Sequence, residues 1–121
     1  MKRILFIIIT LMAVTGMHAQ KISYIETTRS WHYVYDENGK KIHTFSTTQG
    51  EVVAYSDSFY IVKHGSWYYT FTPKGKKLHT FSVSNVGEVL SATGDTFTSK
   101  HGSWIYIWDK NGKKIKTMSA R

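Results

Sequence analysis

The stretch Trp67-Tyr68-Tyr69-Thr70-Phe71, followed by Gly75-Lys76-Lys77-Leu78-His79-Thr80-Phe81-Ser82, decides the fold because its pattern occurs three times in this chain. The other two copies begin at Trp31 and Trp104, so the three tryptophans are 36 and 37 residues apart. Self-similarity at a fixed period of this length indicates one supersecondary unit that is repeated along the chain. The repeat therefore predicts an architecture, and it does not by itself name a ligand.

Each repeat contains short runs rich in Tyr, Thr, Val, Ile, Phe and Trp, and turns with Gly or Asn separate these runs every eight to ten residues. This pattern predicts an all-β chain of nearly three tandem four-stranded antiparallel meanders, without helices. The first unit lacks a counterpart of the strand that opens the other two, so we expect eleven strands. The expected strands are Ile22–Thr27, Trp31–Tyr35, Lys41–Ser46, Glu51–Tyr55, Phe59–Lys63, Trp67–Phe71, Lys77–Val83, Glu88–Ala92, Thr96–Lys100, Trp104–Trp108 and Lys114–Met118.

The turn before the last strand of each unit is the best-specified local element. Gly39, Gly75 and Gly112 stand where a tight hairpin needs a positive φ, which glycine adopts without steric cost. Asp36 and Asp109 are placed to accept hydrogen bonds from backbone N–H groups across the turn. Their recurrence is therefore explained without a catalytic function.

Nine aromatic residues lie on one face of three equivalent strands, because side chains alternate between the two faces of a strand. They are Trp31, Tyr33, Tyr35, Trp67, Tyr69, Phe71, Trp104, Tyr106 and Trp108. Each can bury about 150–250 Å², so we expect them to supply much of the core. The alternative is that some of them form platforms for sugars, since a flat ring suits the apolar face of a pyranose.

The first 19 residues are typical of a secretory signal peptide. Lys2 and Arg3 precede an apolar run that is too short to span a bilayer, and Ala19 offers a cleavage point before Gln20. No cysteine occurs, which excludes a lipidated cysteine and disulfides. We expect a secreted or periplasmic bacterial protein without a transmembrane anchor after cleavage. Its one all-β domain covers residues 20–121, with units at about 21–49, 50–86 and 87–121.

The expected mature chain has 14 basic and 8 acidic residues, a net charge of +6. A positive surface attracts anionic polysaccharide, lipopolysaccharide or nucleic acid, and secretion argues against nucleic acid. Lysine pairs after a turn also protect edge strands from unwanted pairing, which is the alternative explanation. The candidate ligand-binding residues are Lys40, Lys41, Lys76, Lys77, Lys113, Lys114, His64 and His101.

Catalytic and metal chemistry find little support in the sequence. A zinc site needs three or four converging ligands, but His43 and His79 lie in different repeats and the third repeat has Lys116 there. Glu51 and Glu88 are the candidate carboxylate pair for glycoside hydrolysis. The alternative is that both are charged residues at the edge of a strand, without a catalytic function. We expect no enzyme, no metal and no cofactor.

The repeat resembles a β-propeller blade of the PQQ or WD-like kind. The resemblance rests on Gly50-Glu51-Val52-Val53-Ala54-Tyr55, Asp57-Ser58-Phe59-Tyr60-Ile61, the tryptophan strand and Gly75-Lys76-Lys77-Leu78-His79-Thr80-Phe81. Such blades are four-stranded meanders, and propellers mostly serve as binding platforms with four to eight blades. With fewer than three units here, the resemblance implies a homodimeric ring of about six blades or a fragment of a longer propeller.

A second resemblance is to the bulb-type mannose lectins, whose prism-shaped domain also has three units of four strands. It implies that Trp31, Trp67 and Trp104 lie near a central axis. The sugar motif of that family is absent, since the aligned stretch reads Lys63-x-Gly65-x-Trp67-x-Tyr69-x-Phe71, so mannose binding does not carry over. A three-unit β-trefoil is a third architecture with this plan.

The sequence thus favours a secreted, non-catalytic binding module for carbohydrate or an anionic surface polymer. Its expected partner is a polysaccharide or a cell surface, not nucleic acid. The alternative is a structural or protein-interaction repeat protein that self-assembles, or a piece of a longer propeller.

Overall fold

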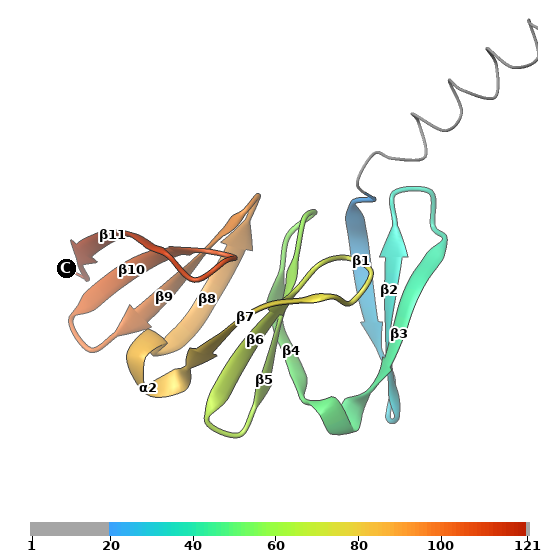
Figure 1. The fold of residues 1–121 in the computed structure, drawn as a ribbon, viewed down its shortest axis with the longest axis horizontal. Coiled ribbons are helices and arrows are strands. Elements are labelled where there is room, and N and C mark those ends of the chain that lie inside the picture. The colour runs from blue at the N-terminus through green and yellow to red at the C-terminus, as the bar shows by residue number, and fades with distance from the viewer. Residues whose placement is uncertain (1–19, 121) are drawn as a thin grey trace, which may run out of the picture.

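The computed structural model describes residues 20–120, which form three antiparallel sheets side by side in a row (Figure 1). The strands of the first sheet are β1 (Ile22–Thr27), β2 (Trp31–Asp36) and β3 (Lys41–Ser46). Those of the second are β4 (Glu51–Tyr55), β5 (Tyr60–His64), β6 (Trp67–Phe71) and β7 (Lys77–Ser82). Those of the third are β8 (Glu88–Thr93), β9 (Thr96–His101), β10 (Trp104–Asp109) and β11 (Lys114–Ser119). The all-β prediction is confirmed, and each of the eleven strands lies within one residue of its expected ends.

The hairpins form as their residues predict. Gly39, Gly75 and Gly112 have φ values of 79°, 93° and 107°. Asp36 Oδ1 accepts hydrogen bonds from the backbone N–H groups of Asn38 and Lys40, both at 2.9 Å. Asp109 makes the equivalent pair of bonds in the third sheet. Turn chemistry therefore accounts for the repeated aspartate.

Short helices connect the sheets, and here the expectation of a chain without helices is wrong. A 3₁₀ turn, η1 (Thr47–Gln49), leads from the first sheet to the second, and one α-helical turn, α2 (Val83–Val86), leads from the second to the third. Val86 is fully buried between the sheets. A single helical turn carries the chain from one sheet to the next and is too short to show a helical period in the sequence.

The core consists of two clusters, one in each space between neighbouring sheets. Between the first and second sheets, the Phe45 ring lies 5.3 Å from the Tyr60 ring. Between the second and third sheets, Phe81 lies 5.3 Å from Phe97. These two contacts use equivalent repeat positions, so the second and third sheets pack in the way that the first and second do.

The face that carries the nine aromatic residues is called the aromatic face below, and the other is the opposite face. The prediction that the aromatic face forms the main core is wrong for the tryptophans that begin the strands, because Trp31, Trp67 and Trp104 are about half exposed. Of the nine, Trp108 is buried, and Tyr33, Tyr35, Tyr69, Phe71 and Tyr106 are partly buried.

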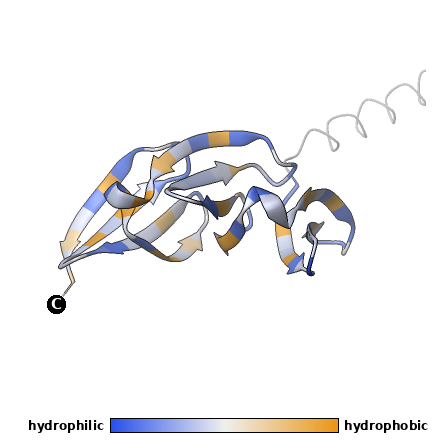
Figure 2. Ribbon diagram, turned by 90° about the horizontal axis from the view of Figure 1, so that it is seen from below, coloured by the Kyte–Doolittle hydropathy of each residue, from blue (hydrophilic) through white to orange (hydrophobic). Residues whose placement is uncertain are grey.

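The opposite face contributes as much to the core, since Val34, Tyr68 and Thr70 are buried. The reason is that the opposite face of each sheet packs on the aromatic face of the next. Hydrophobic and hydrophilic residues alternate along the strands (Figure 2), but alternation alone does not say which face is covered when a sheet has neighbours on both sides.

The row does not close on itself within the described residues. Among the strands of residues 20–120, β1 pairs only with β2 and β11 only with β10, so the first and last sheets are not hydrogen-bonded to each other. The second and third sheets are closest at their first strands, β4 and β8. In residues 20–120 there is no helix with the length and apolar character needed to cross a membrane. The expected signal peptide lies outside the described residues.

Candidate functional site: two edges of the sheet row

The repeated topology places like residues along two edges of the row (Figure 1). The tryptophan edge consists of Trp31, Trp67 and Trp104 with the turns 28–30, 64–66 and 101–103, and it lies along the lower side of the figure. The lysine edge consists of the hairpins that carry Lys40, Lys41, Lys76, Lys77, Lys113 and Lys114. The strands between them have five or six residues, so the edges are about 17–20 Å apart.

On the tryptophan edge, the predicted histidines lie directly opposite two of the tryptophans. His64 pairs with Trp67 and His101 pairs with Trp104 across the hairpin, so both side chains of each pair lie on the aromatic face. Both histidines are exposed, and His101 Nε2 donates to the carbonyl of Ser84 at 2.8 Å. The structure thus places His64 and His101, which were predicted as ligand-binding residues, beside two tryptophans that were predicted to lie in the core.

The exposure of the tryptophans is a property of the edge and does not depend on neighbouring sheets. Trp67 and Trp104 face a preceding sheet and are 48% and 50% exposed, while Trp31, which has no sheet before it in the described part of the chain, is 45% exposed. Each tryptophan is the first residue of its strand and so lies at the end of its sheet. All three indoles are therefore accessible along one edge.

On the lysine edge, the two lysines of each pair differ in their contacts. The second lysine lies over a tyrosine of its own sheet in all three units, with Nζ 4.3 Å from the Tyr33 ring, 5.0 Å from Tyr69 and 4.0 Å from Tyr106. Cation–π contacts of this kind stabilise an exposed site by about 0.5–1 kcal/mol. The first lysine of each pair closes the turn through its backbone, and its side chain is exposed. Among the described residues, each pair thus presents one ammonium group without a ring contact of this kind.

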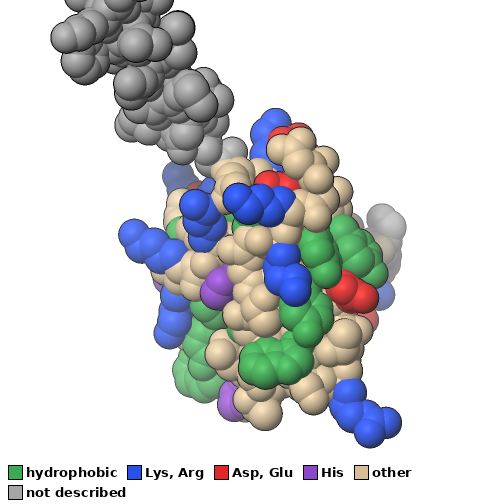
Figure 3. Space-filling view, turned by 90° about the vertical axis from the view of Figure 1, so that its right-hand side faces the viewer, with side chains coloured by type: hydrophobic (Ala, Val, Ile, Leu, Met, Phe, Trp, Pro, Cys, Tyr) green, Lys and Arg blue, Asp and Glu red, His purple; other side chains and the backbone are tan. Residues whose placement is uncertain are grey.

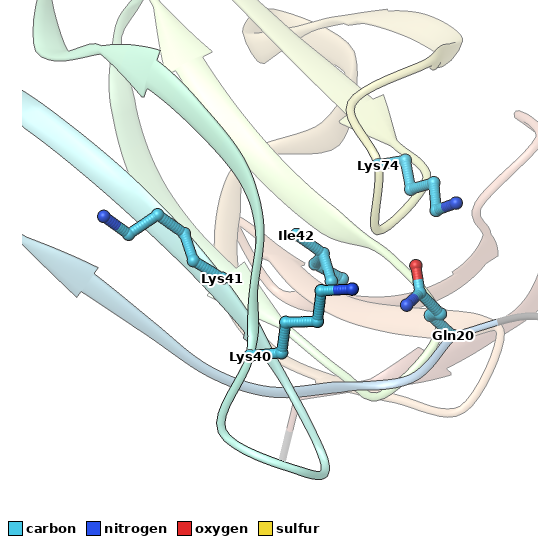
Figure 4. Close-up of a pocket in the computed structure, with 5 residues that line it drawn as sticks. All are labelled: Gln20, Lys40, Lys41, Ile42 and Lys74. Atoms are coloured by element: carbon cyan, nitrogen blue, oxygen red, sulfur yellow. The ribbon is translucent and has the colours of Figure 1, made fainter.

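A shallow hollow of about 180 Å³ lies where the first two lysine hairpins meet, lined by Gln20, Lys40, Lys41, Ile42 and Lys74 (Figure 4). Gln20 Oε1 is buried and has no hydrogen-bond partner among residues 20–120. Lys40 and Lys41 are among the residues predicted from the sequence, whereas Lys74 is not. It precedes the repeated Gly-Lys-Lys, and asparagine occupies its position in the other two units, so the repeat carried no signal for it.

The histidines considered as metal ligands have a packing explanation. A Cβ on Gly75 would overlap the ring of His43, and one on Gly112 would overlap the ring of His79. The hairpin glycine of one sheet therefore rests on a histidine of the sheet before it. Burial lowers the pKa of His43, which favours the neutral ring. Among residues 20–120, no group of three or more His, Cys, Asp or Glu side chains is placed to hold a metal ion.

The two glutamates considered as a catalytic pair lie at the starts of β4 and β8. Glu51 is opposite Lys63 and Glu88 is opposite Lys100 in the neighbouring strand, and cross-strand pairs of opposite charge stabilise a sheet.

No family model matches the chain, and no similar protein was found among the curated proteins. The two edges are therefore the features of this structure that bear on function.

Proposed function

We propose that this chain is a secreted, non-catalytic module that binds polysaccharide along its tryptophan edge. The observation that carries the proposal is the row of three half-exposed indoles at the same repeat position. Indole combines a flat apolar surface with one polar N–H group. It therefore suits a binding surface, where the ring packs on the partner and the N–H group can reach water. The row of equivalent rings favours an extended polymer over a single small ligand.

Variation among the repeats supports this assignment. Buried positions tolerate replacement, since buried His32 corresponds to buried Tyr68 and buried Val34 corresponds to buried Thr70. The half-exposed tryptophan is retained in all three units, although an exposed ring contributes less to packing than a buried one. A requirement for binding explains a tryptophan at this position better than packing does.

Three equivalent sites on one polymer act together, because binding at the first raises the effective concentration at the others. Replacing any one tryptophan should therefore weaken binding, and replacing all three should abolish it. We expect a single Trp→Ala change to lower the affinity about tenfold, which corresponds to about 1.4 kcal/mol.

The test is a glycan array followed by pull-down on insoluble polysaccharides, with the purified chain and two matched triple variants. Trp31→Ala, Trp67→Ala and Trp104→Ala together should remove binding to neutral glycans. Lys40→Glu, Lys76→Glu and Lys113→Glu together should leave it intact. Absence of any bound glycan, or equal binding by the tryptophan triple variant, would overturn the proposal.

A second candidate is binding of an anionic polymer at the lysine edge. It is favoured by Lys40 and Lys74, which come from neighbouring sheets and line the same hollow (Figure 4). Binding of this kind falls steeply with salt concentration. The same two triple variants separate the candidates, because here the lysine changes would remove binding and the tryptophan changes would not.

A further inference from the structure

The aromatic face of the first sheet is open, although the same face is covered in the other two sheets. Tyr60 and Phe97 are each 1% exposed, whereas Tyr24, at the equivalent position, is 53% exposed. Figure 3 looks at this end of the row and shows hydrophobic side chains lying among charged ones at the surface. The first sheet therefore presents a face that the repeat elsewhere buries.

The opposite face of the third sheet is open in the same way. Leu90 is 49% exposed and Ile115 is 53% exposed, while the equivalent Val53 and Leu78 of the second sheet pack against the core cluster before the third. The strand register places four more uncharged side chains on this face, among the charged Glu88, Lys100 and Lys116. They are Thr98, Ile105, Ile107 and Met118.

We propose that these two faces bind each other between two copies of the chain. The aromatic face of the first sheet of one copy packs on the opposite face of the third sheet of the other, and the reciprocal contact closes a ring of six sheets. Each joint repeats the packing already present between the first and second and between the second and third sheets. The occupant of each open face is thus a second copy, and the joint continues an interface that the chain forms twice within itself.

The internal contacts identify the residues that meet across this joint. Phe45 contacts Tyr60 at the first internal joint, and Phe81 contacts Phe97 at the second. By the same repeat positions, Met118 of one copy meets Tyr24 of the other. A thioether against an aromatic ring is a favourable contact.

At both internal joints, a side chain of one sheet donates a hydrogen bond to a glycine carbonyl that precedes the next sheet. His32 Nε2 donates to the Gly50 carbonyl at 2.9 Å, and Tyr68 Oη donates to the Gly87 carbonyl at 2.7 Å. The third sheet has Ile105 at this position. Gly50 and Gly87 directly precede β4 and β8, and the described part of the first sheet has no equivalent strand. At the joint between two copies, the first sheet therefore offers no equivalent glycine carbonyl, and an apolar residue at position 105 suits this joint.

Both faces carry charges of both signs. On the aromatic face of the first sheet, Glu26 accepts a hydrogen bond from Tyr35 Oη at 3.0 Å, and Lys41 lies over the Tyr33 ring. On the opposite face of the third sheet, Lys100 and Lys116 are in register with Ile105 and Ile107, and Glu88 is opposite Lys100. Opposite charges that meet across a joint fix its register and disfavour other pairings.

The number of copies follows from the geometry of the row. A head-to-tail interface closes into a ring where its rotation allows and otherwise continues as a filament. The second and third sheets are closest at β4 and β8, which gives the row a convergent inner side. Propellers close with four to eight blades. Two copies of the chain supply six sheets, so the ring consists of two copies.

The test is light scattering of the purified protein on a sizing column, over a wide range of concentrations. We expect twice the mass of one chain. Tyr24→Arg and Leu90→Asp should each give a single-chain mass, and mixing these two variants should restore the doubled mass. In the mixed ring one joint is native, and the other contains both the arginine and the aspartate. Gln49→Arg, an exposed change away from both faces, is the charge control and should keep the doubled mass.

A single-chain mass for the unaltered protein would overturn the proposal. So would a doubled mass that neither face variant reduces, or a mass that grows beyond two copies with concentration. Circular dichroism of each variant establishes that it has folded, and recovery on mixing is expected only from folded chains. The tryptophan triple variant should retain the doubled mass, so failure of polysaccharide binding and failure of assembly are separate results.

Discussion

Truncation of equivalent aromatic residues at Phe97 and Tyr24 should have very different effects on stability. Phe97 is almost completely buried, and its ring lies 5.3 Å from Phe81 and 6.4 Å from Trp108. Phe97→Ala removes these contacts and leaves a cavity between the second and third sheets, which costs about 3–5 kcal/mol. A domain of about this size loses about 4–8 °C in Tm for each kcal/mol, so we expect Tm to fall by at least about 12 °C.

Tyr24→Ala changes the same repeat position on an open face. The ring of Tyr24 is half exposed and stacks on Tyr35 with centroids 6.4 Å apart. Loss of such an aromatic pair costs about 0.5–1.5 kcal/mol. In dilute solution, where two copies separate, we therefore expect a loss of about 1 kcal/mol.

The assay is urea unfolding of both variants and the unaltered protein, followed by far-ultraviolet circular dichroism at low protein concentration. The free energy of unfolding should fall at least twice as much for Phe97→Ala as for Tyr24→Ala. Equal losses would refute the reasoning, because they would mean that the open face of the first sheet is covered within a single chain. At high concentration the loss for Tyr24→Ala should increase, since the unaltered protein is then stabilised by assembly.

Three further predictions concern single side chains. Gly39→Ala should cost about 1–2 kcal/mol through its positive φ alone, and Gly75→Ala should cost more because its Cβ would also overlap a histidine ring; urea midpoints of the two variants test the order. Thr70→Val removes the 2.7 Å hydrogen bond to the Lys110 carbonyl and should cost about 1 kcal/mol, and an unchanged midpoint would contradict this. Burial raises the pKa of Tyr60 above its ordinary 10.0, so the folded chain keeps a proton that the unfolded chain loses at high pH. Its contribution is full below about pH 10 and declines above it by up to about 1.4 kcal/mol per pH unit, and Tyr60→Phe should make that decline shallower in urea titrations.

Much of the secondary structure could be predicted because it depends on neighbours in the chain. Alternating apolar residues mark the strands, and glycine and aspartate mark the hairpins through backbone preferences that act within a few residues. Comparison of the repeats added a check, since the same strand is expected three times. The helical turn Val83–Val86 was missed because four residues carry no period.

The candidate site was predicted only in part. His64, His101 and the six hairpin lysines were named, and all of them are exposed, because polar residues next to turns rarely lie inside a small domain. Trp31, Trp67 and Trp104 were assigned to the core, as large aromatic residues usually are. Lys74 was missed because its proximity to Lys40 depends on how two sheets meet.

By itself, the sequence determined the repeat, the strands and the turns, since these follow from interactions between residues close together in the chain. Only the tertiary structure decided which of these residues are covered. Tyr24 and Tyr60 are the same amino acid at the same repeat position, yet Tyr24 is half exposed and Tyr60 is buried. The difference arises from the place of each sheet in the row, because burial depends on a neighbouring sheet whose residues are distant in the sequence.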